Sequence, residues 1–338
     1  MAVSSSVEQQ VLSFLVEAGD ETLPSEMVAK KLGVPAAETL GALEGLRSRG
    51  YRIDGRGKGW RLVGYPERLG ENELEPLLST RDLGRRLRFL ETVSSTSEVA
   101  WRMGEEGAPH GLTVVADQQT QGKGRNGRVW SSPPGVNLYF SALLRPDISA
   151  AHAPELTLVA AVAVCEALRE SGCERARIKW PNDVEIGGRK ISGLLTELSA
   201  DGQDIDFVVL GIGVNVNMTA ETLPPEVRET ATSVQMSLGR PYPRVRLLAR
   251  LLERLEGWMD RYEDEGFGAV RARWTSLSST IGARVRLTLG GRALEGRAES
   301  LDESGHLLVR VDSGSLERVV AGDVEHLTPN PSPTSGEG

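Results

Sequence analysis

The most informative stretch of the sequence is a glycine-rich basic loop between residues 118 and 130. Its centre, residues 122–128, reads Gly-Lys-Gly-Arg-Asn-Gly-Arg, so that three glycines and three cations fall within seven residues. A glycine-rich backbone can bring its N–H groups close to a phosphate, and the cations offset the phosphate charge. The loop therefore predicts binding of a phosphorylated ligand.

The same loop matches the G-x-G-x-x-G fingerprint of dinucleotide-binding folds, which requires a helix that opens at the last glycine. The residues that follow Trp130 read Ser-Ser-Pro-Pro-Gly, and this run cannot continue a helix. A G-x-x-x-x-G-K-[ST] phosphate loop does not occur in the sequence. The sequence therefore disfavours a Rossmann fold and excludes a Walker-type site.

Further blocks stand before and after the loop in a fixed order. Ser95-Thr96 precedes it, and residues 179–183 (Lys-Trp-Pro-Asn-Asp) follow, then 189–197 and 211–217 (Gly-Ile-Gly-Val-Asn-Val-Asn). Together with the loop they resemble the signature of the biotin protein ligases and cover most of residues 90–240. With 179–183 and 189–197 counted as one block, four blocks in the family's order are far more specific than any one of them.

The resemblance implies a reaction in two steps. Biotin and ATP first give biotinyl-AMP and pyrophosphate, and the biotin is then transferred to a lysine of a biotin carboxyl carrier protein. ATP with Mg²⁺ enters as co-substrate and biotin as substrate, so we expect no tightly bound prosthetic group and no metal ligands from the protein. Because a carboxylate attacks an α-phosphate, cations must offset the repulsion between two anions.

Specific residues match the family's functional positions. Lys190 would reach the biotin carboxylate and the α-phosphate, Arg125 would hold the adenylate, and Asp183 would orient the acceptor lysine; these are the predicted catalytic residues. An exposed aspartate is a poor base, which favours orientation over full proton transfer. The positions matched to biotin are Ser95, Thr96, Gln119, Gly193 and again Lys190, and those matched to the nucleotide are Gly122, Lys123, Gly124, Arg125, Arg128, Trp130, Asn215, Thr232 and Ser233.

Two positions depart from the family's pattern. Ser97 stands where asparagine is usual after the Ser-Thr pair, which bears on how the biotin-facing turn is braced. Lys123 stands where arginine is usual, which keeps the charge and loses the planar fork of the guanidinium.

Two other interpretations stay open on the sequence. A lipoate ligase or octanoyl transferase has a related catalytic fold, although the Lys-Trp-Pro-Asn-Asp block and the glycine-basic loop favour biotin. A transcription factor that binds biotin or its adenylate only as a signal would need no reactive lysine, and Lys190 counts against it.

Composition sets outer limits on fold and location. At roughly 150 residues per domain, 338 residues predict two or three domains. The sequence has no apolar run of the roughly 18 to 20 residues that a membrane helix needs, and its first 16 residues do not resemble a signal peptide. We therefore expect a cytoplasmic protein without a membrane partner, in which Cys165 and Cys173 stay reduced. The net charge of −8 permits only a local nucleic-acid-binding patch.

Residues 1–64 predict three short helices and a two-stranded hairpin, the arrangement of a winged helix-turn-helix. Six cations lie between residues 47 and 61 with a single acidic residue among them, which would suit a phosphate backbone such as that of operator DNA. The third helix, however, carries Glu38 and Glu44 and no asparagine or glutamine to read bases. A docking domain that has lost operator binding is therefore the alternative. The predicted DNA contacts are Arg47, Arg49, Arg56 and Lys58.

The remainder of the chain completes an α+β protein. Residues 65–86 predict a linker, and alternating helical and strand-like runs in 87–275 predict the mixed α/β catalytic domain of the biotin/lipoate ligase type, with amphipathic helices at 154–171 and 244–265. Four or five short strands in 276–328 predict a small SH3-like β-barrel, and 329–338 a disordered tail. The family resemblance also suggests a homodimer in which central sheets pair edge to edge.

Overall fold

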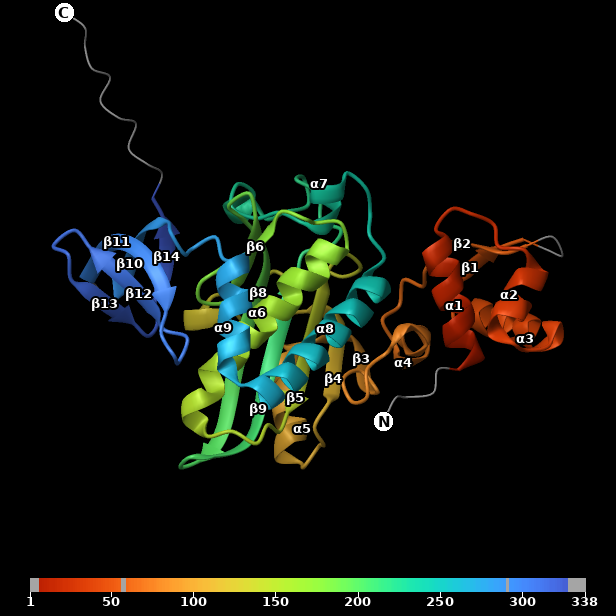
Figure 1. Ribbon diagram of the computed structural model, residues 1–338, viewed down its shortest axis with the longest axis horizontal. Helices are drawn as coiled ribbons and strands as arrows, with labels where there is room; N and C mark the ends of the chain where they lie inside the picture. Colours follow the sequence, from red (N-terminus) through yellow and green to blue (C-terminus); the bar gives the residue numbers. More distant parts are fainter. Residues whose placement is uncertain (1–5, 56–58, 290–291, 328–338) are drawn as a thin grey trace, which may run out of the picture.

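The computed structural model describes residues 6–55, 59–289 and 292–327, and their elements form three units along the chain (Figure 1). The N-terminal unit has its own apolar core, to which Leu12, Leu43 and Trp60 contribute. Pro24 and Pro35 occupy the positions just before the second and third helices. Its elements are α1 (Val7–Ala18), α2 (Ser25–Leu32), α3 (Ala36–Ser48), β1 (Arg52–Asp54) and β2 (Arg61–Gly64).

Arg47, predicted to contact DNA, braces the hairpin of the N-terminal unit. Its guanidinium donates to the carbonyl oxygens of Ile53 (2.8 Å) and Gly55 (3.3 Å) and lies over the ring of Trp60, 5.1 Å from the centroid. These contacts give Arg47 a bracing role in the hairpin, and its contact with DNA stays a prediction.

Arg49 likewise joins two parts of the chain and does not present a free cation. Its guanidinium forms ion pairs with Glu8 at 2.9 Å and with Glu75 at 3.0 Å, so that it links α1 to the segment after the hairpin. Of the four predicted DNA contacts, Arg56 and Lys58 lie outside the described residues. The predicted tail, residues 329–338, also lies outside them.

The segment predicted as a linker is folded against its neighbours. It contains α4 (Glu71–Leu74) and a 3₁₀ turn (Glu75–Leu77), and Leu69, Leu74 and Leu83 are buried in the core of the central unit. The hydroxyl of Tyr51 donates to the Glu73 carbonyl at 2.7 Å and so ties this segment to the N-terminal unit. The leucines, spaced among turn-forming residues, are the apolar signal that the linker assignment overlooked.

The central unit is built on a mixed sheet whose described strands run in the order β3-β4-β5-β9-β8-β7-β6. β3 and β4 are parallel, and every other neighbouring pair is antiparallel. The strands are β3 (Arg86–Val93), β4 (Leu112–Gln119), β5 (Leu138–Leu144), β6 (Ala176–Lys179), β7 (Asp183–Ile186), β8 (Arg189–Asp201) and β9 (Asp204–Val214).

Helices cover both faces of this sheet. α6 (Ala153–Glu170) packs on one face and is in turn covered by α8 (Arg244–Glu265) and α9 (Phe267–Leu277), while α5 (Thr96–Glu105) packs on the other (Figure 1). By length and composition alone α6 could cross a membrane, but most of it is buried between the sheet and the outer helices. It is therefore the core helix of this unit. The short helix α7 (Val234–Leu238) follows β9 in the chain.

The alternation of side chains along β9 decides where the sheet can hold a ligand. Leu210 and Ile212 point into the core beneath α6, whereas Val209 points toward α5 on the opposite face. Because successive residues of a strand face opposite sides, Gly211 and Gly213 fall on the α5 face. That face of the sheet therefore lacks side chains at the end of β9.

The C-terminal unit is an antiparallel sheet with the described strand order β13-β12-β11-β10-β14, as the four or five short strands of the sequence predicted. It is packed beside the central unit at the end of α9 (Figure 1). The strands are β10 (Arg284–Leu289), β11 (Arg292–Leu301), β12 (Leu307–Val311), β13 (Leu316–Val319) and β14 (Asp323–His326).

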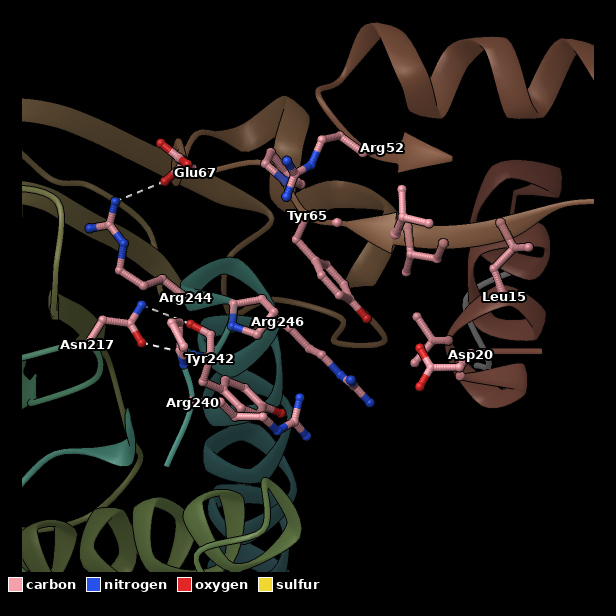
Figure 2. A pocket seen from close by; sticks show the side chains of 18 of the residues that line it. Leu15, Asp20, Arg52, Tyr65, Glu67, Asn217, Arg240, Tyr242, Arg244 and Arg246 are labelled. Atoms are coloured by element: carbon pink, nitrogen blue, oxygen red, sulfur yellow. Dashed lines mark hydrogen bonds between the residues drawn. The ribbon is translucent and has the colours of Figure 1, made fainter. Parts of the chain in front are cut away.

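Arg244, the first residue of α8, joins three segments of the chain and is only 8% exposed. One guanidinium nitrogen donates to the carboxylate of Asp117 (2.8 Å) and to the carbonyl of Asn137 (3.2 Å). The other donates to the carbonyl of Glu67 at 3.0 Å (Figure 2). The cation is therefore fully partnered in a nearly dry place.

Replacing Arg244 by methionine should lower the free energy of unfolding by about 3 kcal/mol, because it leaves a carboxylate and two carbonyl groups without their donor. The measurement is urea-induced unfolding followed by circular dichroism. Arg254→Met, which removes a cation from an exposed pair with Glu170, is the control and should cost less than about 1 kcal/mol. Equal losses of unfolding free energy in the two variants would show that the buried contacts of Arg244 stabilise the fold no more than an exposed ion pair does.

Candidate active site

A cavity of about 310 Å³ opens on the α5 face of the central sheet, beside the C-terminal unit. Its walls come from the start of α5, the glycine-rich loop, the β7–β8 hairpin and β14. Most of the residues predicted for the site line this one cavity, although they come from separate blocks of the sequence. They are Ser95, Thr96, Gln119, Lys123, Gly124, Arg125, Arg128, Trp130, Asp183, Lys190 and Gly193.

The floor of the cavity is backbone. Gly193 on β8 is paired directly with Gly213 on β9, and the indole of Trp130 lies on both. A Cβ atom would lie 3.1 Å from that indole at Gly193 and 2.6 Å from it at Gly213. A Cβ at Gly211 would lie 2.6 Å from the hydroxyl of Ser97. Any larger residue at these positions would fill the space that the cavity needs.

Lys190 places a cation above this floor. Its Nζ lies 2.6 Å from Oδ1 of Asp183 and 5.4 Å from the centroid of the Trp130 ring. Its backbone is held by Thr230 and Thr232, through Lys190 N–H to the Thr230 carbonyl (2.7 Å) and Thr232 N–H to the Lys190 carbonyl (2.9 Å). The side chain is 37% exposed, so the ammonium group can exchange Asp183 for another anion in the cavity.

A hydroxyl and amide network closes the opposite end of the cavity. Oε1 of Gln119 accepts from the N–H of Thr96 (2.9 Å) and from its hydroxyl (3.2 Å), and Nε2 donates to the Ser132 hydroxyl (2.9 Å). The Ser141 hydroxyl lies 2.8 Å from that of Thr96 and 3.1 Å from that of Ser97. Ser97, one of the two departures from the family pattern, is therefore braced by a second serine.

The glycine-rich loop is a hairpin closed by its own backbone. Gly124 N–H donates to the Arg128 carbonyl at 2.7 Å, and Trp130 N–H donates to the Gly122 carbonyl at 2.8 Å. Asn126 at the tip has a φ of 55°, in the left-handed region. A Cβ atom at Gly122 would lie 2.4 Å from the carbonyl oxygen of Trp130. Gly122 itself does not line the cavity. The structure therefore gives Gly122 the role of allowing this close approach.

Two cations of the loop are tied to the central unit. Lys123 forms an ion pair with Glu98 of α5 at 3.0 Å, and Arg125 donates to the side-chain oxygen of Asn182 at 3.0 Å. The hydrogen bond from Ser94 (2.6 Å), together with that from Lys123, lowers the pKa of Glu98 below its usual value. Lys123 thus stays a partner for a carboxylate, as an arginine would.

The third cation of the loop reaches the C-terminal unit. Arg128 forms an exposed ion pair with Asp323, the first residue of β14, and both line the cavity. Nothing in the sequence pointed to Asp323, since a single aspartate in a strand-rich segment carries no recognisable pattern. Asn182 was also missing from the predicted site, although it belongs to the Lys-Trp-Pro-Asn-Asp block.

Three residues predicted to lie near the nucleotide do not line the cavity: Asn215, Thr232 and Ser233. The side-chain amide of Asn215 donates to the Thr232 carbonyl at 3.0 Å. The Ser233 hydroxyl is fully buried, accepts from Met236 N–H at 3.1 Å and so caps α7. These side chains hold the segment that positions Lys190, so the structure gives them a supporting role.

Two family models match the chain. Residues 89–215 match the biotin/lipoate A/B protein ligase family, and residues 280–327 match the biotin protein ligase C-terminal domain. The first match contains the start of α5, the glycine-rich loop and the strands that form the cavity floor.

Similar proteins cover the chain more fully. It is 34% identical over 322 residues to the bifunctional ligase/repressor BirA of Bacillus subtilis, and the alignment spans 95% of this chain and 99% of the relative. It is 30% identical to BirA of Escherichia coli, over 91% of this chain and 94% of the relative. The solved biotin protein ligase of Aquifex aeolicus in complex with biotin and ATP is 33% identical, with a TM-score of 0.61 over 71% of this chain and 98% of that one. On these matches the chain belongs to the biotin protein ligase family.

Proposed function

We propose that this chain is an ATP-dependent biotin protein ligase that forms biotinyl-AMP and transfers the biotin to a lysine of a biotin carboxyl carrier protein. The observation that carries the proposal is the position of Lys190, whose Nζ faces Asp183 above the Gly193 and Gly213 floor. The relatives support it, because one is named a ligase/repressor and another is solved with biotin and ATP.

The cavity has the two kinds of surface that biotin requires. A ureido ring needs fixed hydrogen-bonding partners, and the Thr96, Gln119 and Ser97 network offers hydroxyl and amide groups that are already oriented. The fused apolar ring and its chain need a flat surface without polar groups. We assign that surface to the glycine floor, where Trp130 now lies.

Activation of the biotin carboxylate requires that two anions approach each other. Lys190 would leave Asp183 and stand between the carboxylate and the α-phosphate, where its charge stabilises both the ground and transition states. Arg125 would hold the phosphate from the loop. We propose that Mg²⁺ arrives with the triphosphate, since this ion is usually held by substrate phosphates and water with few protein ligands.

Transfer requires a neutral lysine amine at the biotinyl carbonyl, although an unperturbed lysine has a pKa of about 10.4. Asp183, released from Lys190 when Lys190 binds the adenylate, would face the incoming amine and orient it. The side chain of Asp183 is 24% exposed, so we propose orientation and charge stabilisation, with the proton passing to solvent.

The alternatives differ in outcome. A lipoate ligase or octanoyl transferase would use lipoate or octanoate, and a relative from Paracoccus denitrificans, 34% identical and named a biotin–[acetyl-CoA-carboxylase] ligase, supports biotin. A transcription factor that only senses biotin would have no use for the Lys190–Asp183 pair. A competition between biotin and lipoate for labelling of the carrier distinguishes a biotin ligase from a lipoate ligase. Any labelling of the carrier excludes a transcription factor that only senses biotin.

We further propose the parts that family membership alone leaves open. We propose a winged helix-turn-helix in the N-terminal unit and an SH3-like barrel in the C-terminal unit, which the order of their described elements supports. The two free cysteines are buried, which supports a reducing, cytoplasmic location. The sheet ends at β3 and β6, and a homodimer would pair one of these edges.

With biotin, ATP–Mg²⁺ and a carrier domain, the protein should label one lysine and release pyrophosphate. Lys190→Ala should lower the rate of pyrophosphate release by about 10² to 10³, the usual effect of removing one electrostatic stabiliser of a transition state. Arg189→Ala, the exposed neighbour on β8, is the matched control and should act like the wild type. Normal turnover of Lys190→Ala would remove the proposed role, and no labelling by the wild type would refute the function.

Arg125→Gly should release biotinyl-AMP before transfer, because the loop loses both a cation and its bond to Asn182. Labelling of serum albumin lysines, measured with streptavidin, should rise several-fold over that of the wild type. Arg125→Lys keeps the charge and should fall between the two. Unchanged stray labelling would show that the loop does not retain the intermediate.

We propose that Arg56 and Lys58 carry the main phosphate contacts in any binding of DNA by the N-terminal unit, because Arg47 and Arg49 already have partners within the chain. The double variant Arg56→Gln, Lys58→Gln should then reduce the slope of log affinity against log salt by about two for a mixed-sequence duplex. Fluorescence anisotropy measures the slope, with Arg254→Gln as the control. An unchanged slope would favour a docking domain without DNA binding.

A further inference from the structure

A second and larger cavity, of about 640 Å³, lies between the N-terminal and central units. One wall comes from α1 and the β1–β2 hairpin, the other from the turn before α8 and its first residues (Figure 2). We call it the interdomain cleft and define it by Asp20, Arg52, Tyr65, Arg240, Tyr242 and Arg246. It shares no lining residue with the active-site cavity.

Arginines without an anionic partner line the cleft from both sides. Arg52 belongs to the N-terminal unit, and Arg240 and Arg246 belong to the central unit; none of them forms an ion pair with a described residue. Arg244, next to Arg246, has a carboxylate and two carbonyls. The fold therefore satisfies the neighbouring cation, whereas Arg240 and Arg246 extend into the cleft from the central unit, where a bound anion would offset their repulsion (Figure 2). Arg52 lies along Gly64 on the hairpin side of Tyr65.

Aromatic rings stand beside these cations. Tyr65 lines the cleft and carries the guanidinium of Arg246 over its ring, 5.8 Å from the centroid, while Tyr242 is buried in the facing wall (Figure 2). The backbone of Tyr242 is fixed by Asn217, which donates to its carbonyl at 3.0 Å and accepts from its N–H at 2.9 Å. The cleft thus offers a preformed wall with flat apolar surface and charge together.

We propose that the interdomain cleft binds a nucleotide-type ligand, a phosphate ester that carries a planar ring. Arg240 and Arg246 would bind its phosphate from the central unit and Arg52 from the hairpin, with the ring against Tyr65. The volume lies within the usual 300 to 1,000 Å³ of small-molecule sites. This ligand touches both units, so its binding fixes the orientation of one relative to the other.

Asp20 lowers the positive charge of the cleft. It lies on the wall opposite Arg246 and, with Glu67, supplies the acidic side chains among the described lining residues (Figure 2). A DNA backbone could also meet the arginines. The ring of Tyr65 beside the arginines favours a small ligand with an accessible ring, because duplex DNA keeps its bases stacked inside.

The test is equilibrium dialysis of the full chain with GTP, with pyrophosphate and guanosine as probes of phosphate and ring alone. GTP should bind more tightly than either part, and the double variant Arg240→Gln, Arg246→Gln should weaken it about tenfold or more, because charge-assisted bonds to phosphate are lost. Asp20→Asn should tighten binding. Arg254→Gln, elsewhere on α8, should leave it unchanged, and circular dichroism confirms that each variant is folded.

The active site serves as the internal comparison. Arg125→Ala should not alter GTP binding if the cleft holds the ligand; loss of GTP in Arg125→Ala with retention in the double variant would assign GTP to the active site and overturn the proposal. Absence of GTP binding would also overturn it. A weaker affinity of the double variant for duplex DNA, with GTP unaffected, would replace the proposal by a DNA contact. None of these outcomes depends on whether the chain ligates biotin.

Discussion

The active-site cavity exists because the inner strands of the central sheet carry no side chain at Gly193, Gly211 and Gly213. The alternate positions on the same strands, such as Leu194 and Ile212, are filled and form the core beneath α6. A slip of one residue in either strand would put a leucine or isoleucine into the cavity and glycines into the core. The register of β8 against β9 therefore fixes the core and the site together.

Above this rigid floor, the parts that meet the ligand are held by contacts that are easy to exchange. Lys190 pairs with Asp183, Lys123 with Glu98 and Arg128 with Asp323, all at partly exposed positions. Exposed pairs contribute at most about 1 kcal/mol each, so a phosphate can replace a carboxylate at little cost. The division between a fixed floor and a loop of exchangeable cations suits a site that must bind, react and release within each turnover.

Local patterns in the sequence predicted local structure well. The amphipathic repeat over 244–265 matches the bounds of α8, and the basic glycine loop is a hairpin at the cavity. The glycines at 211 and 213, alternating with apolar residues, could also have indicated a strand with one bare face. Each of these signals lies within a few neighbouring residues, where the sequence expresses them directly.

What the sequence did not show depends on partners distant in the chain. Arg47 and Arg49 form a basic patch in the sequence, yet each finds a partner that only the fold supplies. Asp323 meets Arg128 across 195 positions, and no spacing announces it. The leucines of 65–86 are buried by elements distant in the sequence, among them α8 and β3. The role of a charged or apolar residue can be assigned only when its neighbours in space are known.

The indole that rests on Gly193 and Gly213 gives the site an uncommon thermodynamic character. A flat ligand that settles on this floor must first move Trp130, so one apolar surface is exchanged for another. Because the heat-capacity change of association follows the net apolar area withdrawn from water, the exchange makes that change smaller than the size of the ligand suggests. The enthalpy of ligand binding should accordingly vary little with temperature.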